Sequence, residues 1–472
     1  MPKFDTRVQE LRYRVLKEIA KHIYNDDLNQ YFYDIPKAIV PGPKPSMRCC
    51  IYKERAIVEE RIKVVLNATT NNKDNVIKVI DIACDECPLG VYSVTDACRG
   101  CIAHRCSEAC PKKAINFTNN LTATINKDLC INCGLCAKAC PYSAIENRIR
   151  PCERICKNKC ISPDPITNAA KINDEKCIHC GSCVYMCPFG AIVDESYIVD
   201  VIGILKSNVK KVAVVAPSIG GNFTEFGVKK VIAALKQLGF DMVIEAALGA
   251  DIVAKNESLE LAESGKLTSS CCPAFTSYIE KNYPTLKEHI SNSLSPMATI
   301  SKEIKEKDPT SKIIFIGPCT AKKFEIKDDK VKKYVDSCLT FEEVQALFDA
   351  KEIDIASLKE EEYDLSGSYY GRGFAKCGGL TNAVKQSLEE ENISFDVHGV
   401  VCSGIKDIKN ALNDMKNNKN NINFIEGMMC DGGCIGGPCN LTHELKNKIS
   451  LEKDAQAAAK SINKNINKKE GL

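Results

Sequence analysis

Cysteine is the residue type in this sequence with the greatest capacity for chemistry, at 28 of 472 residues. Before residue 190 many of the cysteines recur as Cys, three residues and Cys, followed shortly by Ala-Ile or Cys-Ile. The four copies of this pattern are Cys106–Cys110, Cys136–Cys140, Cys152–Cys156 and Cys183–Cys187. Thiols at such spacing in a long chain indicate metal ligation, because dense disulfide frameworks belong to short secreted chains.

Two of these copies have the full spacing of a [4Fe–4S] ligand loop. Cys-x-x-Cys-x-x-Cys supplies three corners of a cube, and a distant Cys followed by Pro supplies the fourth, which in two-cluster ferredoxins ligates the other cluster. This exchange predicts two ligand sets: Cys130, Cys133 and Cys136 with Cys187, and Cys177, Cys180 and Cys183 with Cys140. The alternative is zinc, which also favours Cys-x-x-Cys but seldom has the third Cys and the following Cys-Pro.

The other two copies are less regular. The same exchange predicts Cys98, Cys101 and Cys106 with Cys156, and Cys84, Cys87 and Cys152 with Cys110. Lys157 replaces the usual Pro, and Cys160 stands where the other copies have Ala, so we expect Cys160 not to be a ligand. Zinc, or a single cluster with spare thiols, is the alternative here. Four accessory clusters in a row would carry single electrons between the surface and a buried centre.

A second constellation lies in three widely separated motifs of the C-terminal half. They are TSSCCPAF at 268–275, GPCTAKKFE at 317–325 and EGMMCDGGCIGG at 426–437. One thiolate from each of the first two motifs and two from the third would hold one more metal site. Lys322 would place a cation beside that anionic site. The alternative is a set of buried structural cysteines in a Rossmann-like domain.

With the ferredoxin-like segment before them, these motifs resemble the iron-only (FeFe) hydrogenases from about residue 76 to residue 450. The extended cysteine-rich N-terminus and the Ala-Phe that ends the first motif resemble the group B branch. The resemblance implies an H-cluster, a [4Fe–4S] cube joined through one thiolate to a two-iron unit with CO, CN and azadithiolate ligands. The implied cube ligands are Cys272, Cys319, Cys430 and Cys434, of which Cys434 bridges to the two-iron unit.

The resemblance also implies roles around the two-iron unit. Cys271 matches the free thiol that passes protons to the azadithiolate amine, and Lys322 matches the residue that hydrogen-bonds a cyanide. The remaining cofactor contacts are Ala216, Pro217 and Ser218, in the loop that holds the other cyanide, and Met428, an apolar residue beside the bridging carbonyl.

The family's proton route implies two glutamates and a serine, which fall on Glu257, Glu260 and Ser291. The i, i+3 spacing of the glutamates places both carboxylates on one face of a helix. The alternative is that they are ordinary exposed helix glutamates. The outermost position of the route, usually Arg, falls on Ser264, which leaves the exit to solvent open.

The elements that must position these residues form four segments. We expect a helical N-terminal segment at 1–75, an α+β ferredoxin-like iron–sulfur region at 76–200, an α/β H-cluster domain at 201–450 and a solvated tail at 451–472. In the third segment, β-branched runs such as KVAVV and KIIFI alternate with helical patterns, which is typical of an α/β fold with chemistry at the strand ends. We expect two Rossmann-like lobes around the buried cluster.

Composition restricts the function classes. Lys plus Arg (64) nearly balance Asp plus Glu (61), which argues against a dominant nucleic-acid-binding face. No apolar run approaches membrane-spanning length and the first residues lack a signal-peptide core, so we expect a cytoplasmic protein with no membrane partner. The expected function is an anaerobic ferredoxin hydrogenase, with ferredoxin or a similar one-electron carrier and the maturation enzymes as partners. A hydrogen sensor of low turnover and an iron–sulfur assembly scaffold are the alternatives.

Overall fold

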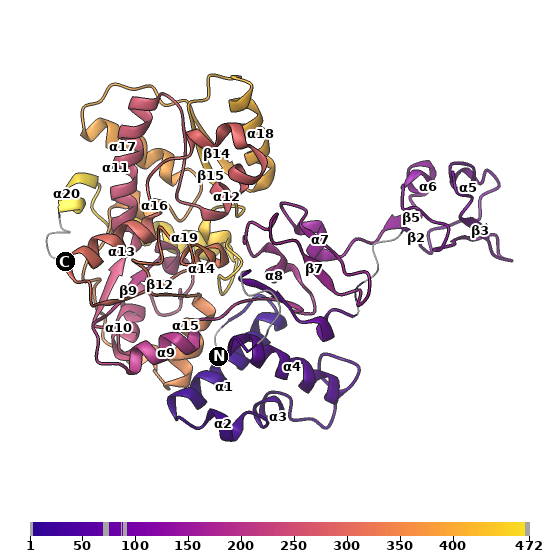
Figure 1. Ribbon diagram of the computed structural model, residues 1–472, viewed down its shortest axis with the longest axis horizontal. Coiled ribbons are helices and arrows are strands. Elements are labelled where there is room, and N and C mark those ends of the chain that lie inside the picture. The colour runs from indigo at the N-terminus through magenta and orange to yellow at the C-terminus, as the bar shows by residue number, and fades with distance from the viewer. Residues whose placement is uncertain (1–2, 69–74, 86, 88–91, 468–472) are drawn as a thin grey trace.

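The computed structural model describes residues 3–68, 75–85, 87 and 92–467. Figure 1 shows an N-terminal helical segment, two small units and a larger α/β part, with the N-terminal helices beside both the α/β part and the nearer small unit. The N-terminal segment contains α1 (Arg7–Tyr24), α2 (Leu28–Tyr31), α3 (Ile35–Ile39) and α4 (Ile51–Val65). Thr6 begins α1 by accepting a hydrogen bond from the amide of Gln9. The inner face of α1 packs against α15 (Phe341–Ala350).

Two small units of similar construction follow. The distal unit, residues 92–147, contains β2 (Tyr92–Val94), α5 (Arg105–Glu108), β3 (Ile115–Phe117), β4 (Ala123–Ile125), α6 (Leu135–Ala139) and β5 (Ile145–Asn147). The proximal unit contains β1 (Ile77–Val79), α7 (Pro151–Ile155), β6 (Ile161–Pro163), β7 (Ala170–Ile172), α8 (Ser182–Met186) and β8 (Ile192–Asp194).

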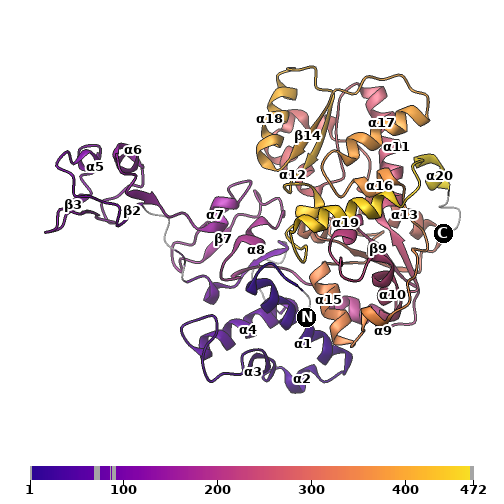
Figure 2. The same ribbon diagram turned by 180° about the vertical axis from the view of Figure 1, so that it is seen from behind.

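The distal unit is inserted into the proximal one. The outer strands of the proximal unit, β1 and β8, pair antiparallel, and the distal unit lies between them in the chain and closes on its own antiparallel pair, β2 with β5. The two views show the distal unit projecting away from the rest of the molecule (Figures 1 and 2). The expected region at 76–200 is therefore two nested units, and each helix pair packs within its own unit, α5 on α6 and α7 on α8.

The α/β part contains two parallel sheets. One has the order β10-β9-β12-β13, from β9 (Lys211–Val215), β10 (Met242–Glu245), β12 (Lys312–Ile316) and β13 (Ser337–Leu339). The other has the order β11-β15-β14, from β11 (Leu267–Thr268), β14 (Gly399–Ser403) and β15 (Phe424–Met428). Strands β9 and β12 are almost continuous runs of buried apolar residues, as expected for parallel strands covered on both faces.

Helices cover and connect these sheets. They are α9 (Ile198–Lys206), α10 (Val228–Leu238), α11 (Ala246–Ser264), α12 (Pro273–Asn282), α13 (Pro296–Lys307), α14 (Thr320–Glu325), α16 (Tyr369–Gly373), α17 (Gly379–Glu390) and α18 (Ile405–Lys416). Gly249 of α11 allows the close approach of α13, because a Cβ there would lie 2.1 Å from the carbonyl oxygen of Pro296. This contact places the start of α13 against α11.

The expectation of a solvated tail at 451–472 is wrong for its described residues. Helix α19 (Leu445–Gln456) crosses the expected boundary, and Leu451 and Ala455 on it are buried. Ile462 of α20 (Ile462–Ile466) is fully buried against α11 and α17. Glu390 at the end of α17 accepts hydrogen bonds from the amides of Ile462 and Asn463. Because the segment is mostly polar, its composition did not predict burial, yet a few apolar residues are sufficient to pack it against the rest of the fold.

A buried cluster of charges joins the three parts of the molecule. Lys323 of α14 contacts Asp194 of β8 at 2.8 Å and Glu343 of α15 at 2.9 Å. Arg12 of α1 contacts Asp194 at 2.6 Å and Glu342 at 2.9 Å. All five side chains are buried, so the N-terminal segment, the proximal unit and the α/β part are connected by ion pairs that water does not reach.

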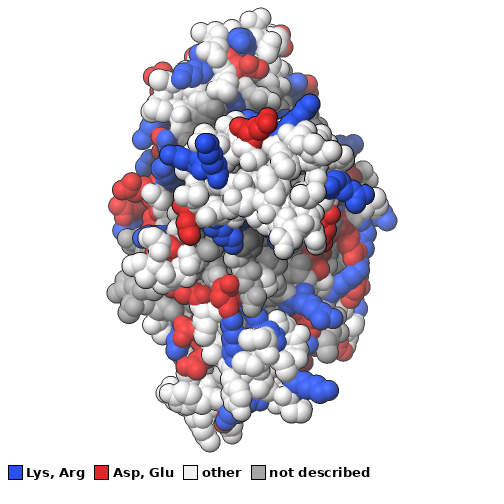
Figure 3. Space-filling view, turned by 90° about the vertical axis from the view of Figure 1, so that its right-hand side faces the viewer, with Lys and Arg blue, Asp and Glu red and all other residues white. Residues whose placement is uncertain are grey.

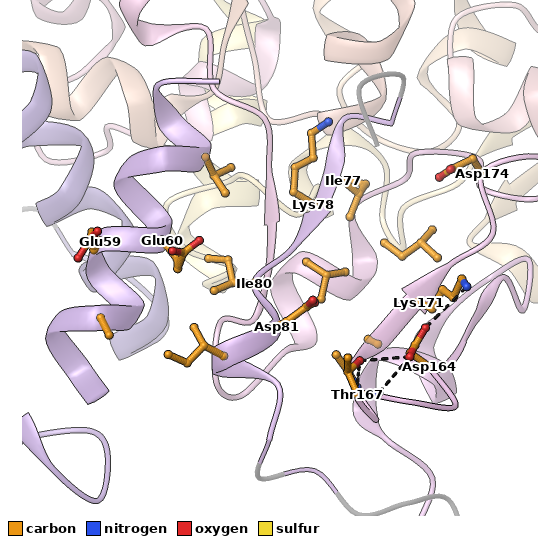
Figure 4. Close-up of a pocket in the computed structure, with 17 residues that line it drawn as sticks. Glu59, Glu60, Ile77, Lys78, Ile80, Asp81, Asp164, Thr167, Lys171 and Asp174 are labelled. Carbon is orange, nitrogen blue, oxygen red and sulfur yellow. Dashed lines mark hydrogen bonds and ion pairs between the residues drawn. The ribbon is translucent and has the colours of Figure 1, made fainter. Parts of the chain in front are cut away.

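A groove with a volume of about 700 Å³ lies between α4 and the proximal unit. Its walls carry apolar residues together with acidic ones, among them Glu59, Glu60, Asp81, Asp164 and Asp174 (Figure 4). No cysteine lines it. The chemistry-bearing residues therefore lie elsewhere in the molecule.

Candidate metal and active site

The structure corrects the predicted exchange of cysteines in the distal unit. Burial raises the pKa of the Cys106 thiol, and nearby Cys140 and Cys101 raise it further. In the same way, burial and the neighbouring Cys130 and Cys110 raise the pKa of Cys136. In the structure the Cys98 set therefore neighbours Cys140, where the spacing predicted Cys156, and the Cys130 set neighbours Cys110, where it predicted Cys187.

The proximal unit repeats this arrangement. Burial raises the pKa of Cys152, and the closest thiols acting on it are Cys187, Cys84 and Cys87. The thiols acting on buried Cys183 include Cys180, Cys177 and Cys156. Cys84, Cys87 and Cys152 therefore gather with Cys187 rather than Cys110, and Cys177, Cys180 and Cys183 with Cys156 rather than Cys140. The exchange of cysteines between neighbouring sets therefore occurs within each unit, because the distal unit is inserted whole between β1 and β8 of the proximal unit.

One hydrogen bond recurs at all four sites. The amide of the residue four positions after the last cysteine of each copy donates to that cysteine's sulfur, at distances of 3.2 to 3.4 Å. The pairs are Ala114 with Cys110, Ala144 with Cys140, Cys160 with Cys156 and Ala191 with Cys187. This shared backbone geometry explains why the repeat extends past its second cysteine. In the described part of the chain, no three His, Cys, Asp or Glu side chains converge closely enough to hold a single metal ion.

The three C-terminal motifs meet between the two parallel sheets. Cys272 begins α12 and Cys319 begins α14, while Cys430 and Cys434 follow β15. Burial raises the pKa of Cys434, and Cys319 and Cys272 raise it further. The same thiols also act on buried Cys430. Four thiols from distant parts of the chain therefore surround one place at the ends of the strands.

A cavity of about 90 Å³ adjoins these thiols. All six residues that the resemblance placed around the two-iron unit line it: Ala216, Pro217, Ser218, Cys271, Lys322 and Met428. Further apolar side chains, among them Met297 and Phe374, also line the wall. Sequence reasoning missed these two residues, because single apolar residues outside a motif carry no recognisable signal.

Two polar groups at this cavity differ in their partners. The hydroxyl of Ser218 is buried and has no hydrogen-bond partner among the residues that the structure describes. The ammonium of Lys322 forms an ion pair with Glu325 at 2.6 Å, and both side chains are largely buried. Soft thiolates, an unpartnered hydroxyl and a mostly apolar wall fit an organometallic group that has weakly polar ligands. Glu325 ends the second motif, but nothing in the sequence indicated that it holds Lys322.

Two of the predicted proton-route residues, Glu257 and Glu260, lie on α11. Glu257 is fully buried, and its carboxylate accepts hydrogen bonds from the amide and the hydroxyl of Ser270, at 2.9 and 2.8 Å. Burial raises the pKa of Glu257 to about 7. Cys271 is close enough for Glu257 to raise the pKa of its thiol, which burial already places well above the ordinary value. The Cys271 thiol thus stays protonated next to a carboxyl group that titrates near neutral pH.

The route continues towards the surface through Ser291. Its hydroxyl donates to Glu260 at 2.7 Å, and it also lies close enough to Glu257 to act on the pKa of that carboxyl. The amide and the side chain of exposed Asn292 hold the other oxygen of Glu260, at 3.0 and 2.7 Å. Ser264 stands where the outermost residue of the family's route is usually Arg. It is exposed, and among the described residues its hydroxyl donates only to the carbonyl of Lys266. The chain of groups reaches solvent at Glu260 and Asn292.

The Cys177 set lies next to the central thiols. Cys180 packs in the same apolar cluster as Cys272 and Cys319. The hydroxyl of Thr320 donates to the carbonyl of His179 at 2.7 Å, and Gly181 is so close to Thr320 that a Cβ would lie 2.4 Å from that hydroxyl oxygen. This site is therefore the accessory site nearest to the central one.

Comparison with known families agrees with these two regions. Residues 209–438 match the model of the iron-only hydrogenase large subunit, C-terminal domain, and residues 123–146 and 170–193 match that of the 4Fe-4S binding domain. None of the described helices is long and apolar enough to cross a membrane.

The individual relatives include hydrogenases and an iron–sulfur cluster assembly factor. Iron hydrogenase 1 of Clostridium pasteurianum is 29% identical over 299 residues, 51% of this chain and 52% of the relative. The cytosolic Fe-S cluster assembly factor NAR1 of Kluyveromyces lactis is 34% identical over 187 residues, 37% of this chain and 38% of the relative. A solved [FeFe]-hydrogenase structure, from work on oxygen inactivation of the H cluster 2Fe subcluster, aligns with a TM-score of 0.50 and 19% identity over 58% of this chain and 93% of that one. The chain spans about half to three fifths of the length of the first hydrogenase relatives it matches.

Proposed function

Because the chain is an FeFe-hydrogenase-like protein, we propose that it is a ferredoxin hydrogenase, which interconverts protons and electrons with dihydrogen. The observation that carries the proposal is the meeting of four thiols, a mainly apolar cavity and a buried proton route at one place. In the proposal, a [4Fe–4S] cube held by Cys272, Cys319, Cys430 and Cys434, with a two-iron unit that carries CO, CN and azadithiolate, supplies the hydride chemistry when bound.

The residues around the cavity position that group and exclude water. The unpartnered hydroxyl of Ser218 and the ammonium of Lys322 lie in separate stretches of the chain, and both offer hydrogen-bond donors to the cavity. Glu325 holds Lys322 in place and compensates its charge in a site without water. Met297, Phe374 and Met428 provide apolar surface, which strengthens these few polar contacts.

Protons travel along the chain's own side chains. The buried thiol of Cys271 exchanges a proton at the cavity, and Glu257 exchanges it on the inner side of α11. Ser291 connects the two glutamates, and Glu260 exchanges the proton with solvent. A carboxyl group whose pKa is near 7 both takes up and releases a proton at neutral pH at little cost.

Replacing Glu257 with Gln tests this route. Glutamine keeps the shape of the side chain but does not carry a proton, so we expect turnover of the maturated protein to fall about a hundredfold at unchanged iron content. The infrared band of a protonated carboxyl, which in the parent protein declines as pH rises through about 7, should be missing from the variant's difference spectrum. Glu263→Gln, on the exposed end of α11, is the matched control. Equal turnover in the two variants would contradict the route.

Electrons enter, in this proposal, through the distal unit from ferredoxin or a similar carrier. That unit carries several exposed large apolar side chains: Ile102, Leu121, Leu129, Ile131, Leu135 and Tyr142. The face on which it projects has acidic and basic residues separated by broad uncharged areas (Figure 3). An apolar surface around a cluster site suits brief docking of a small electron carrier. From there electrons pass to the Cys177 set beside the central site.

The similarity to NAR1 supports a second candidate, an iron–sulfur assembly scaffold. A scaffold without a two-iron unit has no need of a buried free thiol, a cavity or a proton route, and this chain has all three. A sensor would use the same centre at very low turnover. Hydrogen evolution and uptake by the protein co-expressed with the maturation enzymes separate the three: sustained turnover is expected, trace turnover indicates a sensor, and none indicates a scaffold. None of the described cysteines is in a disulfide, which is in keeping with the cytoplasmic location that we also propose.

A further inference from the structure

One of the four accessory sites differs from the others at two positions. In three copies the last cysteine is followed by Pro and, four positions on, by Ala: Pro111 and Ala114, Pro141 and Ala144, and Pro188 and Ala191. The copy that ends at Cys156 has Lys157 and Cys160 at these places. Because the backbone geometry is the same in all four copies, the two replacements add chemistry to an otherwise equivalent site.

Cys160 adds a hydrogen-bond donor to the cluster ligands. Its amide makes the shared bond to the sulfur of Cys156 at 3.2 Å, as Ala does in the other copies. In addition, its own sulfur lies 3.3 Å from that of Cys156, and it also contacts the thiol of Cys177. Cys160 is 7% exposed, so water does not compete for this S–H group. Alanine has no polar hydrogen to offer at the other three sites.

Lys157 adds a positive charge on the side that faces the central site. Its ammonium donates to the carbonyl of Met429, the residue before Cys430. It acts electrostatically on Cys180 of the accessory site and on Cys430 of the central site. Lys157 and Cys160 line the same small cavity as the four thiols of the Cys177 set. Proline at this position would carry no charge and could not donate a hydrogen bond to the carbonyl of Met429.

Both additions favour the reduced form of a cluster. One-electron reduction makes a [4Fe–4S] cluster and its thiolates more negative by one charge, and no bond is formed or broken. A nearby cation and hydrogen bonds to the sulfurs both stabilise that charge and raise the reduction potential. The effect is confined to the site that contains Lys157 and Cys160.

We propose that Lys157 and Cys160 are positioning residues that raise the reduction potential of the cluster held by Cys156, Cys177, Cys180 and Cys183 above those of the other three accessory clusters. The accessory cluster next to the catalytic site then retains an electron in preference to the distal unit, so that electrons collect where two are needed. This inference rests on the cluster assignment within the proposed function and does not require hydrogen turnover.

The test is a redox titration followed by electron paramagnetic resonance, on full-length protein that holds its [4Fe–4S] clusters but not the two-iron unit. The variants are Lys157→Met, which keeps the stem and removes the charge, and Cys160→Ala, which restores the residue of the other copies. We expect each to lower the equilibrium constant for reducing one cluster about tenfold, a shift of about 59 mV per tenfold for one electron. The midpoints of the other clusters and the iron content stay unchanged, and Lys157→Arg restores the parent midpoint.

Lys159→Met is the matched control, because Lys159 is an exposed neighbour that does not line the cavity. Unchanged midpoints in both variants, or an equal shift in the Lys159 control, would overturn the inference. Loss of about four irons in Cys160→Ala would overturn it as well, since Cys160 would then be a ligand. A protein that shows the expected shifts but no hydrogen turnover would refute the proposed function and leave the inference standing.

Discussion

Replacement of Cys271 with alanine is expected to lower hydrogen turnover at least about a hundredfold, the usual effect of losing a positioned proton donor. The residue lies at the cavity, and its thiol stays protonated because burial and Glu257 raise its pKa. Alanine leaves the neighbouring Cys272 and the other central thiols in place. Iron content and the spectra of the clusters should therefore match those of the parent protein.

The control for this variant is Cys338→Ala, which removes another buried thiol, from β13 and outside the cavity lining. Turnover of the control should remain within a few-fold of the parent. Parent-like turnover in Cys271→Ala at full iron content would remove Cys271 from the proton route. An equal loss in both variants would point to a general effect of deleting buried thiols.

Lys323→Met is expected to lower the free energy of unfolding by about 3–5 kcal/mol, the cost of leaving buried charges without their partner. The lysine is fully buried and pairs with Asp194 of the proximal unit and with Glu343 of its own α/β part. Methionine fills the same space but leaves Glu343 without its cation and Asp194 with Arg12 alone. The measurement is the calorimetric melting temperature of the cluster-loaded protein, with denaturant midpoints as a second readout.

Lys327→Met is the matched control, because its ion pair with Glu195 at 2.7 Å is partly exposed. Exposed pairs contribute about 0–1 kcal/mol, so the control should melt close to the parent. If the two variants melted at the same temperature, the buried charge cluster would not be what joins the N-terminal segment to the rest.

Cysteine spacing predicted which thiols share a loop better than it predicted which loops pack together. Local spacing determines which thiols share one loop, so the Cys98, Cys130 and Cys177 sets were visible in the sequence. The fourth member of each set depends on which loops pack together, and that depends on the insertion of one unit into another. Nothing in a cysteine pattern distinguishes nested units from a linear row.

The central site was predictable because its residues lie in motifs that resemble a family, and the family resemblance is confirmed. Residues outside the motifs were not predictable. Asn292 meets Glu260 only because β11 and α11 bring residues far apart in the chain together, and Met297 reaches the cavity only because Gly249 admits α13. Buried residues on β9 and β12 were predictable from their continuous apolar runs, whereas docking of the C-terminal helices depended on three apolar side chains in a polar segment.

Infrared spectroscopy of the protein co-expressed with the maturation enzymes shows whether Cys272, Cys319, Cys430 and Cys434 hold an H-cluster beside the cavity. We expect sharp carbonyl and cyanide bands that disappear in Cys434→Ser, together with iron for five cubes and a two-iron unit. Full cubane content without these bands, in a preparation where a known hydrogenase acquires them, would contradict this expectation.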